Sequence, residues 1–344
     1  MAASSRQFRV AVVGATGVVG AEMLRVLKQR EFPVGEVRAL ASERSAGQTV
    51  AFNGSRLEVA ALDEHSFEGI DIALFSAGAG IARDYAPIAV EAGALVIDNS
   101  SAWRMAENCP LVVPEVNGDD ISAGEGIIAN PNCCAIPLAM VVEAIRQAVG
   151  IERVVVATYQ SASGAGKPLV DELEEQTRVI ASGGHPVASV YPKQLAHNVV
   201  PGGWSLEADA YNEEEVKIVN ETRKILHDPS LRVAVTCVRV PVPVGHGEAV
   251  FLETAGEISA EQARSVLDAF PGITVEDDLA GAVYPTPAEV AGKDDVYVGR
   301  IRRDQSTRHG LALWVVSDNL RKGAALNAVQ VAERAIEMGV LRST

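Results

Sequence analysis

The sequence predicts an α/β fold in which a domain built on a doubly wound parallel sheet is followed by an α+β domain with a mixed sheet. Two observations predict it. Short apolar runs alternate with helical stretches up to residue 130, and longer strand-like runs with few helices between them follow. At about 150 residues per domain, a length of 344 residues also suggests two domains. We place them at residues 1–130 and 131–318, with residues 319–344 completing the first domain.

The first domain opens with a β-branched run at Phe8–Val13, which ends in glycine and precedes a helical pattern with Met23, Leu24 and Leu27 on one side. The predicted order is therefore strand, glycine-rich turn, helix. Separate apolar runs predict further strands at Val37–Ala41, Leu57–Leu62, Ile70–Phe75 and Ala94–Ile97, and a helix at Ile81–Ala92.

The second domain opens with a predicted helix at Ala135–Val149 and a strand at Arg153–Gln160. The polar, Gly- and Pro-rich stretch Ser182–Tyr211 is too long for a simple connection, so it indicates a functional loop or an inserted lid. An alanine-rich amphipathic helix at Ala324–Met338 is expected to return to the first domain. Later apolar runs predict strands at Arg232–Val240, Ala249–Ala255, Val296–Arg302 and Leu311–Val316.

The composition excludes several classes of protein. Thirty Lys and Arg against 45 Asp and Glu give a net charge of −15, which argues against nucleic-acid or anionic-membrane binding. Four cysteines without a Cys-x-x-Cys pair suggest neither a disulfide scaffold nor a zinc site, so we expect no metal and a reducing compartment. Met1–Arg9 lacks the apolar region of a secretory signal, and we therefore expect a cytoplasmic protein that does not enter a membrane.

Three glycines, Gly14, Gly17 and Gly20, stand at the offsets of a dinucleotide-binding turn, directly after the first strand and at the start of a helix. Glycines there let backbone amides and the helix N-terminus approach a pyrophosphate. This pattern predicts a Rossmann-type site. The alternative is a tight strand-to-helix turn that binds no ligand.

In such a site, the residues at the end of the second strand determine whether NADP or NAD binds. Arg44 and Ser45 are suited to a ribose 2′-phosphate and favour NADP, whereas Glu43 is suited to a 2′-hydroxyl. A solvated loop that happens to contain an arginine is the alternative.

Cys133 is a candidate nucleophile. Asn132 can cap a helix whose first turn contains Cys133, and Pro137 is tolerated early in that helix. The helix dipole stabilises a thiolate at that end. The cap alone leaves a nucleophile and an inert core thiol equally open, and the adjacent Cys134 fits the core role better.

A thiolate nucleophile in a dehydrogenase implies a thioester and an acid/base residue. Of six histidines, His246 stands between two glycines, where its imidazole can reach a ligand, and His185 is its rival. Glu214 and Lys217 share one helix face and, with Arg104 and Arg239, could bind a zwitterionic, phosphorylated substrate. Alternatively, His246 is simply an exposed histidine in a loop, and the acidic residues around Glu214 merely complement the helix dipole.

These motifs, in this order, resemble the aspartate-semialdehyde dehydrogenase family over essentially the whole chain. The matching segments are residues 14–20, 42–47, 98–104, 130–133, 158–160 and 163–166, Glu214 with Lys217, residues 239–242 ending at His246, and residues 317–323. The resemblance implies an NADP-dependent oxidoreductase that reduces L-4-aspartyl phosphate to L-aspartate 4-semialdehyde in lysine, threonine and methionine biosynthesis. It also implies a homodimer.

The resemblance implies roles for individual residues. Cys133 would form the acyl-enzyme, and His246 would be the acid/base. Arg239 would hold the substrate carboxylate, Glu214 its amino group, and Gln160 would orient the acyl group. Arg104 and Lys217 would hold the phosphate, and we also place Asn132 with the substrate-binding residues. The NADP site would comprise Gly14, Thr16, Gly17, Val18, Val19, Arg44, Ser45, Ser163, Gly164 and Asn319.

Two other functions stay open at this stage. N-acetyl-glutamyl-phosphate reductase shares the two-domain plan and the thioester chemistry, although an acylated amino group could not pair with Glu214. A non-catalytic NADP-binding paralogue is the second, although a pure binder needs neither Cys133 nor His246. The sequence also departs from the family pattern at Cys134, where Ser or Thr is common, and in the Gly- and Pro-rich residues 242–245.

Overall fold

The structure is a computed structural model that describes residues 6–341, and these form two compact units. The first unit takes the described residues up to Pro131 and those from Ala324 onward, and the second is Asn132–Gly323. Each unit contains one sheet. Among the described helices, none has the length and apolar character needed to cross a bilayer.

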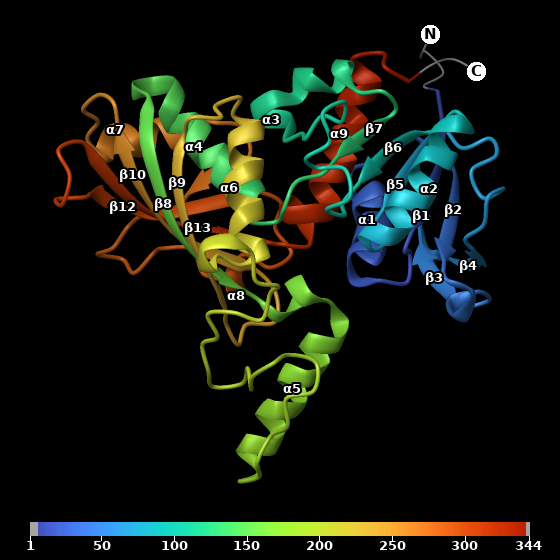
Figure 1. Ribbon diagram of the computed structural model, residues 1–344, viewed down its shortest axis with the longest axis horizontal. Coiled ribbons are helices and arrows are strands. Elements are labelled where there is room, and N and C mark those ends of the chain that lie inside the picture. Colours follow the sequence, from blue (N-terminus) through green and yellow to red (C-terminus); the bar gives the residue numbers. More distant parts are fainter. Residues whose placement is uncertain (1–5, 342–344) are drawn as a thin grey trace. The chain divides into compact units, whose positions relative to one another are not determined.

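The first unit is built on a seven-stranded sheet in the order β3-β4-β2-β1-β5-β6-β7 (Figure 1). Its strands pair in parallel, except that β3 and β4 form an antiparallel hairpin at one edge. The strands are β1 (Phe8–Val13), β2 (Val34–Ala41), β3 (Thr49–Phe52), β4 (Ser55–Ala61), β5 (Ile72–Phe75), β6 (Leu95–Asp98) and β7 (Ile127–Ala129).

Helices cover both faces of this sheet. One core cluster joins Val10 and Val12 of β1 to α1 (Val18–Gln29) and α9 (Leu326–Glu337), and Figure 1 shows the red α9 beside the blue α1. Ala11 and Val13, which point to the opposite face, pack with α2 (Ala79–Glu91). The predicted doubly wound sheet and the return of the C-terminal helix are therefore confirmed. Short helical turns are α3 (Pro114–Asn117), η1 (Glu43–Ser45) and η2 (Gly118–Ala123).

The second unit is built on a six-stranded sheet in the order β11-β12-β13-β10-β8-β9. The pairs β8–β9 and β11–β12 are parallel and the others antiparallel, so the predicted mixed sheet is confirmed. The strands are β8 (Ile151–Gln160), β9 (Arg232–Arg239), β10 (His246–Thr254), β11 (Ile273–Val275), β12 (Val296–Arg303) and β13 (Gly310–Ser317).

The helix α4 (Ala135–Val149) lies against one face of this sheet, and the side chains from Ala135 to Ile145 are buried. The sequence predicted α4 but neither α5 (Lys167–Ala181) nor α7 (Ala260–Asp268), whose polar residues outweigh their apolar ones. The remaining helical segments are α6 (Glu213–Ile225), α8 (Pro287–Val290), η3 (Ala162–Ala165), η4 (Ala208–Ala210) and η5 (Arg321–Ala325).

Strand order brings three predicted site residues to one edge of the second sheet. Gln160 and Arg239 end the parallel strands β8 and β9 and stand opposite each other in register. His246 begins β10, which runs antiparallel to β8, so it starts where β8 ends. The carboxyl ends of β8 and β9 and the amino end of β10 therefore share this edge.

Candidate active site

Asn132 supports the cysteine segment at the start of α4. Its side-chain oxygen accepts hydrogen bonds from the backbone N–H of Cys134 at 2.8 Å and of Ala135 at 3.4 Å. The sequence predicted Asn132 as the cap and Cys133 in the first turn, whereas the helix begins two residues later, at Ala135. Cys133 therefore lies just before the helix, within the field of its positive end.

Cys133 is partly exposed, whereas Cys134 is fully buried. The pKa of the Cys133 thiol lies well below its usual value, first because the Cys134 thiol donates a hydrogen bond to it and then because of His246 and Arg239, although burial opposes the shift. A Cβ atom at Gly323 would stand 2.9 Å from the Cβ of Cys133, so this position needs glycine. The site favours a thiolate at Cys133.

The His246 side chain is 1% exposed, and its hydrogen bonds define its tautomer. Its Nδ1 accepts a hydrogen bond from the backbone N–H of Ser161 at 3.0 Å. In the neutral ring the proton is therefore on Nε2, which has no regular hydrogen-bond partner among the described residues. Nε2–H is thus the donor that His246 can offer to the Cys133 sulfur or to a ligand.

A ring nitrogen of His246 and the sulfurs of Cys133 and Cys134 all lie within 4.8 Å of one another. Such a group has the residue types of a metal site. A metal would need the lone pair of Nε2, however, and the Ser161 N–H directs the ring proton to that nitrogen. The geometry fits a proton donor beside a thiolate better than a set of metal ligands.

Arg239 is buried, and two aromatic rings contact its guanidinium. Its carbon Cζ lies 4.8 Å from the centre of the Trp204 ring and 5.7 Å from that of Tyr191. Nη1 donates to the carbonyl of Ser161 at 2.8 Å, whereas Nε has no partner among the described residues. The guanidinium is therefore held in one orientation with a donor still available for an anion.

Tyr191 and Trp204 belong to the long stretch Ser182–Tyr211, for which the sequence indicates a functional loop or an inserted lid. The carboxylate of Glu172 on α5 accepts hydrogen bonds from the backbone of residues 189–191, and Gln176 accepts from Leu195 and Ala196. The stretch is thus bound to α5 and supplies the aromatic rings at Arg239. The sequence contained no local signal for this pairing.

Glu214, Gln160 and Asn132 form one hydrogen-bonded group. A single carboxylate oxygen of Glu214 accepts from the side-chain amide of Asn132 at 2.8 Å and from that of Gln160 at 3.2 Å. All three side chains are buried. Asn212, in a capping box with Glu215, starts the helix α6 that positions Glu214. The structure therefore brings three predicted substrate residues together.

The two predicted phosphate-binding cations lie in different units. Lys217 forms an ion pair with Glu213 one turn earlier on α6, and the Lys217 side chain is partly exposed. Arg104 belongs to the first unit, where it donates to the backbone carbonyls of Asn130 at 3.0 Å and Asn99 at 2.7 Å.

The glycine turn after β1 has the geometry of a phosphate cradle. Gly14 adopts φ +85°, a region that favours glycine. A Cβ at Gly20 would stand 2.2 Å from the carbonyl oxygen of Gly14, so only glycine lets α1 approach the turn this closely. No side chain caps α1 at Gly17, and Thr16 and Gly17 are exposed. Backbone N–H groups at the start of α1 are therefore available to a pyrophosphate, and the residues fit a dinucleotide.

Two further sets of predicted cofactor residues lie in different units. In the first unit, Arg44 is exposed on η1 and has no ion-pair partner among the described residues, and Ser45 is partly buried. In the second unit, the side-chain oxygen of Asn319 accepts from Ser163 at 3.2 Å and from the backbone N–H of Gly245 at 2.8 Å. Asn319 thus links the loop before His246 to the segment after β8.

A dinucleotide turn on a doubly wound sheet, together with a thiolate beside an imidazole, is typical of nicotinamide-dependent dehydrogenases that act through a cysteine. The family model "Semialdehyde dehydrogenase, NAD binding domain" matches residues 9–124, and "Semialdehyde dehydrogenase, dimerisation domain" matches residues 142–322. The chain belongs to the aspartate-semialdehyde dehydrogenase family, and it is an oxidoreductase with a domain for a nicotinamide cofactor.

Curated relatives and solved structures agree with this assignment. The aspartate-semialdehyde dehydrogenase of Aquifex aeolicus is 49% identical over 97% of this chain and 99% of its own, and that of Bacillus subtilis is 48% identical over 95% and 97%. The crystal structure of aspartate semialdehyde dehydrogenase II from Vibrio cholerae, complexed with ASA, is 48% identical with a TM-score of 0.94, covering 97% of this chain and 99% of that one. The Candida albicans enzyme with NADP is 25% identical with a TM-score of 0.75, over 97% and 100%. The resemblance recognised in the sequence is confirmed, and the comparisons favour its main function over both alternatives.

Proposed function

We propose that this chain catalyses the NADPH-dependent reductive dephosphorylation of L-4-aspartyl phosphate to L-aspartate 4-semialdehyde through a thioester on Cys133. The observation that carries the proposal is the group formed by the Cys133 thiolate, the Nε2–H of His246 and the Nε of Arg239, which has no partner among the residues that the structure describes. It combines a nucleophile, a proton donor and an anchor for a carboxylate in one unit.

Cys133 is the proposed nucleophile. Its lowered pKa makes the thiolate available at neutral pH without a separate base. In the biosynthetic direction the sulfur attacks the acyl phosphate, the C–S bond forms, and inorganic phosphate leaves with the electrons of the C–O bond. In the reverse direction, phosphate attacks the thioester and releases the thiolate.

His246 is the proposed acid/base. Its Nε2–H donates its proton to the acyl oxygen as that oxygen gains negative charge, and Nε2 takes a proton back when the carbon–sulfur bond breaks. Because Ser161 holds Nδ1, the ring cannot rotate without losing that hydrogen bond. When bound, the nicotinamide cofactor supplies the hydride that reduces the thioester.

Arg239 and Glu214 are the proposed anchors of the amino-acid end of the substrate. The guanidinium offers Nε to the substrate carboxylate, and its aromatic contacts limit its movement. One oxygen of Glu214 accepts from Asn132 and Gln160, which leaves the other for the ammonium group. Gln160 orients the acyl group, Asn132 belongs to the substrate-binding residues, and Arg104 and Lys217 bind the phosphate.

NADP is the proposed cofactor. Gly14, Thr16, Gly17, Val18 and Val19 would hold the pyrophosphate at the start of α1, and the exposed Arg44, with Ser45, would hold the 2′-phosphate. In the second unit, we assign Ser163, Gly164 and Asn319 to the same cofactor. We thus propose a dinucleotide-binding domain at residues 1–130, completed by residues 319–344, and a catalytic and dimerisation domain at residues 131–318.

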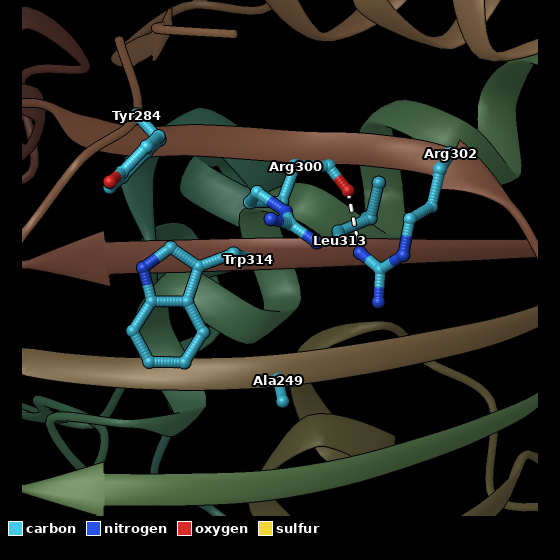
Figure 2. Close-up of a pocket in the computed structure, with 6 residues that line it drawn as sticks. All are labelled: Ala249, Tyr284, Arg300, Arg302, Leu313 and Trp314. Atoms are coloured by element: carbon cyan, nitrogen blue, oxygen red, sulfur yellow. Dashed lines mark hydrogen bonds between the residues drawn. The ribbon is translucent and has the colours of Figure 1, made fainter. Parts of the chain in front are cut away.

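A homodimer is the proposed assembly, in keeping with the name of the matched domain. The face of the second sheet opposite α4 exposes Tyr159 and Phe251 to 38% each. On the same face, Trp314 and Tyr284 line a pocket of about 420 Å³ with Arg300 and Arg302 (Figure 2). A face that exposes aromatic rings in this way fits a second copy of the chain. Introducing a charge with Phe251→Glu should yield monomers in sedimentation experiments, whereas Val199→Glu should not.

The test is NADPH formation from L-aspartate semialdehyde and NADP, with and without inorganic phosphate. Turnover that requires phosphate supports the proposal. Turnover of N-acetyl-glutamate semialdehyde in its place would assign the chain to the other reductase, because an acylated nitrogen carries no charge for Glu214. NADPH binding without any turnover would indicate the non-catalytic paralogue. The biosynthetic reaction, with its water-soluble substrates, also leads us to propose a cytoplasmic location.

A further inference from the structure

Helix α6 carries a second buried carboxylate besides that of Glu214. Glu221 lies about two turns after Glu214, so both side chains leave α6 on the same face. Glu221 is 1% exposed, and Ile218 and Ile225, which share this face, are also buried. The helices α6 and α4 pack against each other in the second unit, and Figure 1 shows them side by side. The mechanism proposed for Cys133 does not use Glu221.

Glu221 binds the peptide group that precedes the proposed nucleophile. Its carboxylate accepts a hydrogen bond from the backbone N–H of Asn132 at 2.5 Å. The carboxylate of Glu214 accepts from the side-chain amide of the same asparagine at 2.8 Å. A carboxylate acceptor makes each bond stronger than one between neutral groups. Two glutamates on one face of α6 therefore hold both the main chain and the side chain of Asn132, next to Cys133.

Asn132 also binds the first turn of α4. Its backbone carbonyl accepts from the N–H of Ile136 at 3.1 Å, and its side-chain oxygen accepts from the N–H of Cys134 at 2.8 Å. Asn132 thus donates to α6 and accepts from α4, so it links the two helices. Because Cys133 stands between Asn132 and Cys134, the backbone on both of its sides is held by these bonds.

We propose that Glu221 is a positioning residue whose carboxylate fixes the peptide group before Cys133 and thereby places the sulfur beside His246. The sulfur of Cys133 and a ring nitrogen of His246 lie within 4.8 Å of each other. Over such a distance, a misplacement of about 1 Å can cost about 10²-fold in rate. The inference rests on the proposed function, because it takes Cys133 as the nucleophile.

The proposed substrate anchors are fixed by other contacts. Arg239 ends β9 and donates to the carbonyl of Ser161 at 2.8 Å. Glu214 is placed by the capping box of Asn212 at the start of α6. Neither contact involves Glu221. Loss of the bond from Glu221 should therefore lower kcat and leave KM nearly unchanged, whereas a general disturbance of the site would change both.

The test compares kcat and KM for L-aspartate semialdehyde in wild type, Glu221→Leu and Glu221→Gln. Leu has a similar volume but accepts no hydrogen bond, so kcat should fall about 10- to 100-fold while KM changes less than about twofold. Gln retains an oxygen acceptor and should restore most of the lost kcat. Thr222→Val is the matched control, because Thr222 is buried on α6 and its hydroxyl has no partner among the described residues. It should retain the wild-type kcat.

Nuclear magnetic resonance gives a second measurement that does not depend on the Leu variant folding. Pro131 and Asn132 form the only Pro–Asn pair in the sequence, so ¹³C-carbonyl proline with ¹⁵N-asparagine labels this peptide group alone. A carboxylate acceptor shifts the amide proton of Asn132 downfield, and in Glu221→Gln the signal should move upfield because the acceptor is neutral.

Three results would overturn the proposal. They are a wild-type kcat in folded Glu221→Leu, a kcat loss of the same size in Thr222→Val, and an Asn132 amide signal that does not move in Glu221→Gln. Failure of the proposed function is recognised separately, because it would appear as an active Cys133→Ala variant.

Discussion

The imidazole Nδ1 of His246 accepts a 3.0 Å hydrogen bond from the backbone N–H of Ser161. A backbone donor cannot give up its proton, so this contact assigns the neutral ring its Nε2–H tautomer. The Ser161 carbonyl also accepts from Arg239, at 2.8 Å. One peptide segment after β8 thus orients both the proposed acid/base and the proposed carboxylate anchor.

The first prediction concerns His246→Gln. The variant loses the imidazole that stabilises the Cys133 thiolate and the proton donor for the acyl oxygen, so kcat should fall by about 10²–10⁴. The lowered pKa of Cys133 means that its alkylation rate is lost as the pH falls through that pKa, and the variant should lose it at a higher pH. Steady-state kinetics and pH-dependent alkylation check this prediction, and an unchanged alkylation profile would contradict it.

The second prediction concerns Arg239→Lys. Lysine keeps the charge but loses the planar fork and its stacking on Trp204. The KM for aspartate semialdehyde should rise about 10- to 100-fold, the range expected for a lost charge-assisted hydrogen bond. Arg232→Lys, at the exposed start of the same strand, serves as the control. Equal KM values in the two variants would show that Arg239 does not bind the substrate carboxylate.

The third prediction concerns Gly164→Ala. A Cβ there would stand 2.9 Å from Nη1 of Arg239 and 3.2 Å from Nε2 of His246. Both groups would have to shift, so kcat/KM should fall by at least about tenfold, while the melting temperature changes little because the site and not the core is disturbed. Gly202→Ala, where a Cβ meets open space, should have normal activity. Full activity in Gly164→Ala would show that this contact does not position the site.

The fourth prediction concerns Arg44→Ala. If Arg44 binds the 2′-phosphate, its removal should weaken NADP binding about 10- to 100-fold and leave NAD binding nearly unchanged. Isothermal titration with both dinucleotides measures the two affinities on one protein. A parallel loss of both affinities would indicate a general effect on the fold. If neither affinity fell, Arg44 would not be the residue that binds the 2′-phosphate.

Local sequence signals were sufficient where one element determines the outcome. Apolar periodicity predicted α4 at its observed bounds, and glycine spacing predicted the turn after β1. They were insufficient where separate segments meet. Nothing near Tyr191 or Trp204 in the sequence indicates Arg239, because their contact depends on how residues 182–211 pack on α5. Ser161 acts through its backbone, which leaves no signature in residue type.

The cysteine pair illustrates the same limit. The sequence predicted a helix cap at Asn132, and the Asn132 side chain does bind the backbone of this segment although the helix begins only at Ala135. That prediction left a nucleophile and a core thiol equally open for Cys133. The distinction comes from tertiary neighbours, since His246 and Arg239 reach the site from β10 and β9. Burial of Cys134 agrees with its predicted core role, although its thiol also contacts the reactive sulfur.

The most direct measurement is phosphate-dependent reduction of NADP by L-aspartate semialdehyde in wild type and Cys133→Ala, with NADP affinity measured on both proteins. The thioester mechanism predicts that turnover disappears in the variant while NADP affinity stays nearly intact, because the dinucleotide contacts assigned here do not include the sulfur. Near-normal turnover in Cys133→Ala would contradict the mechanism.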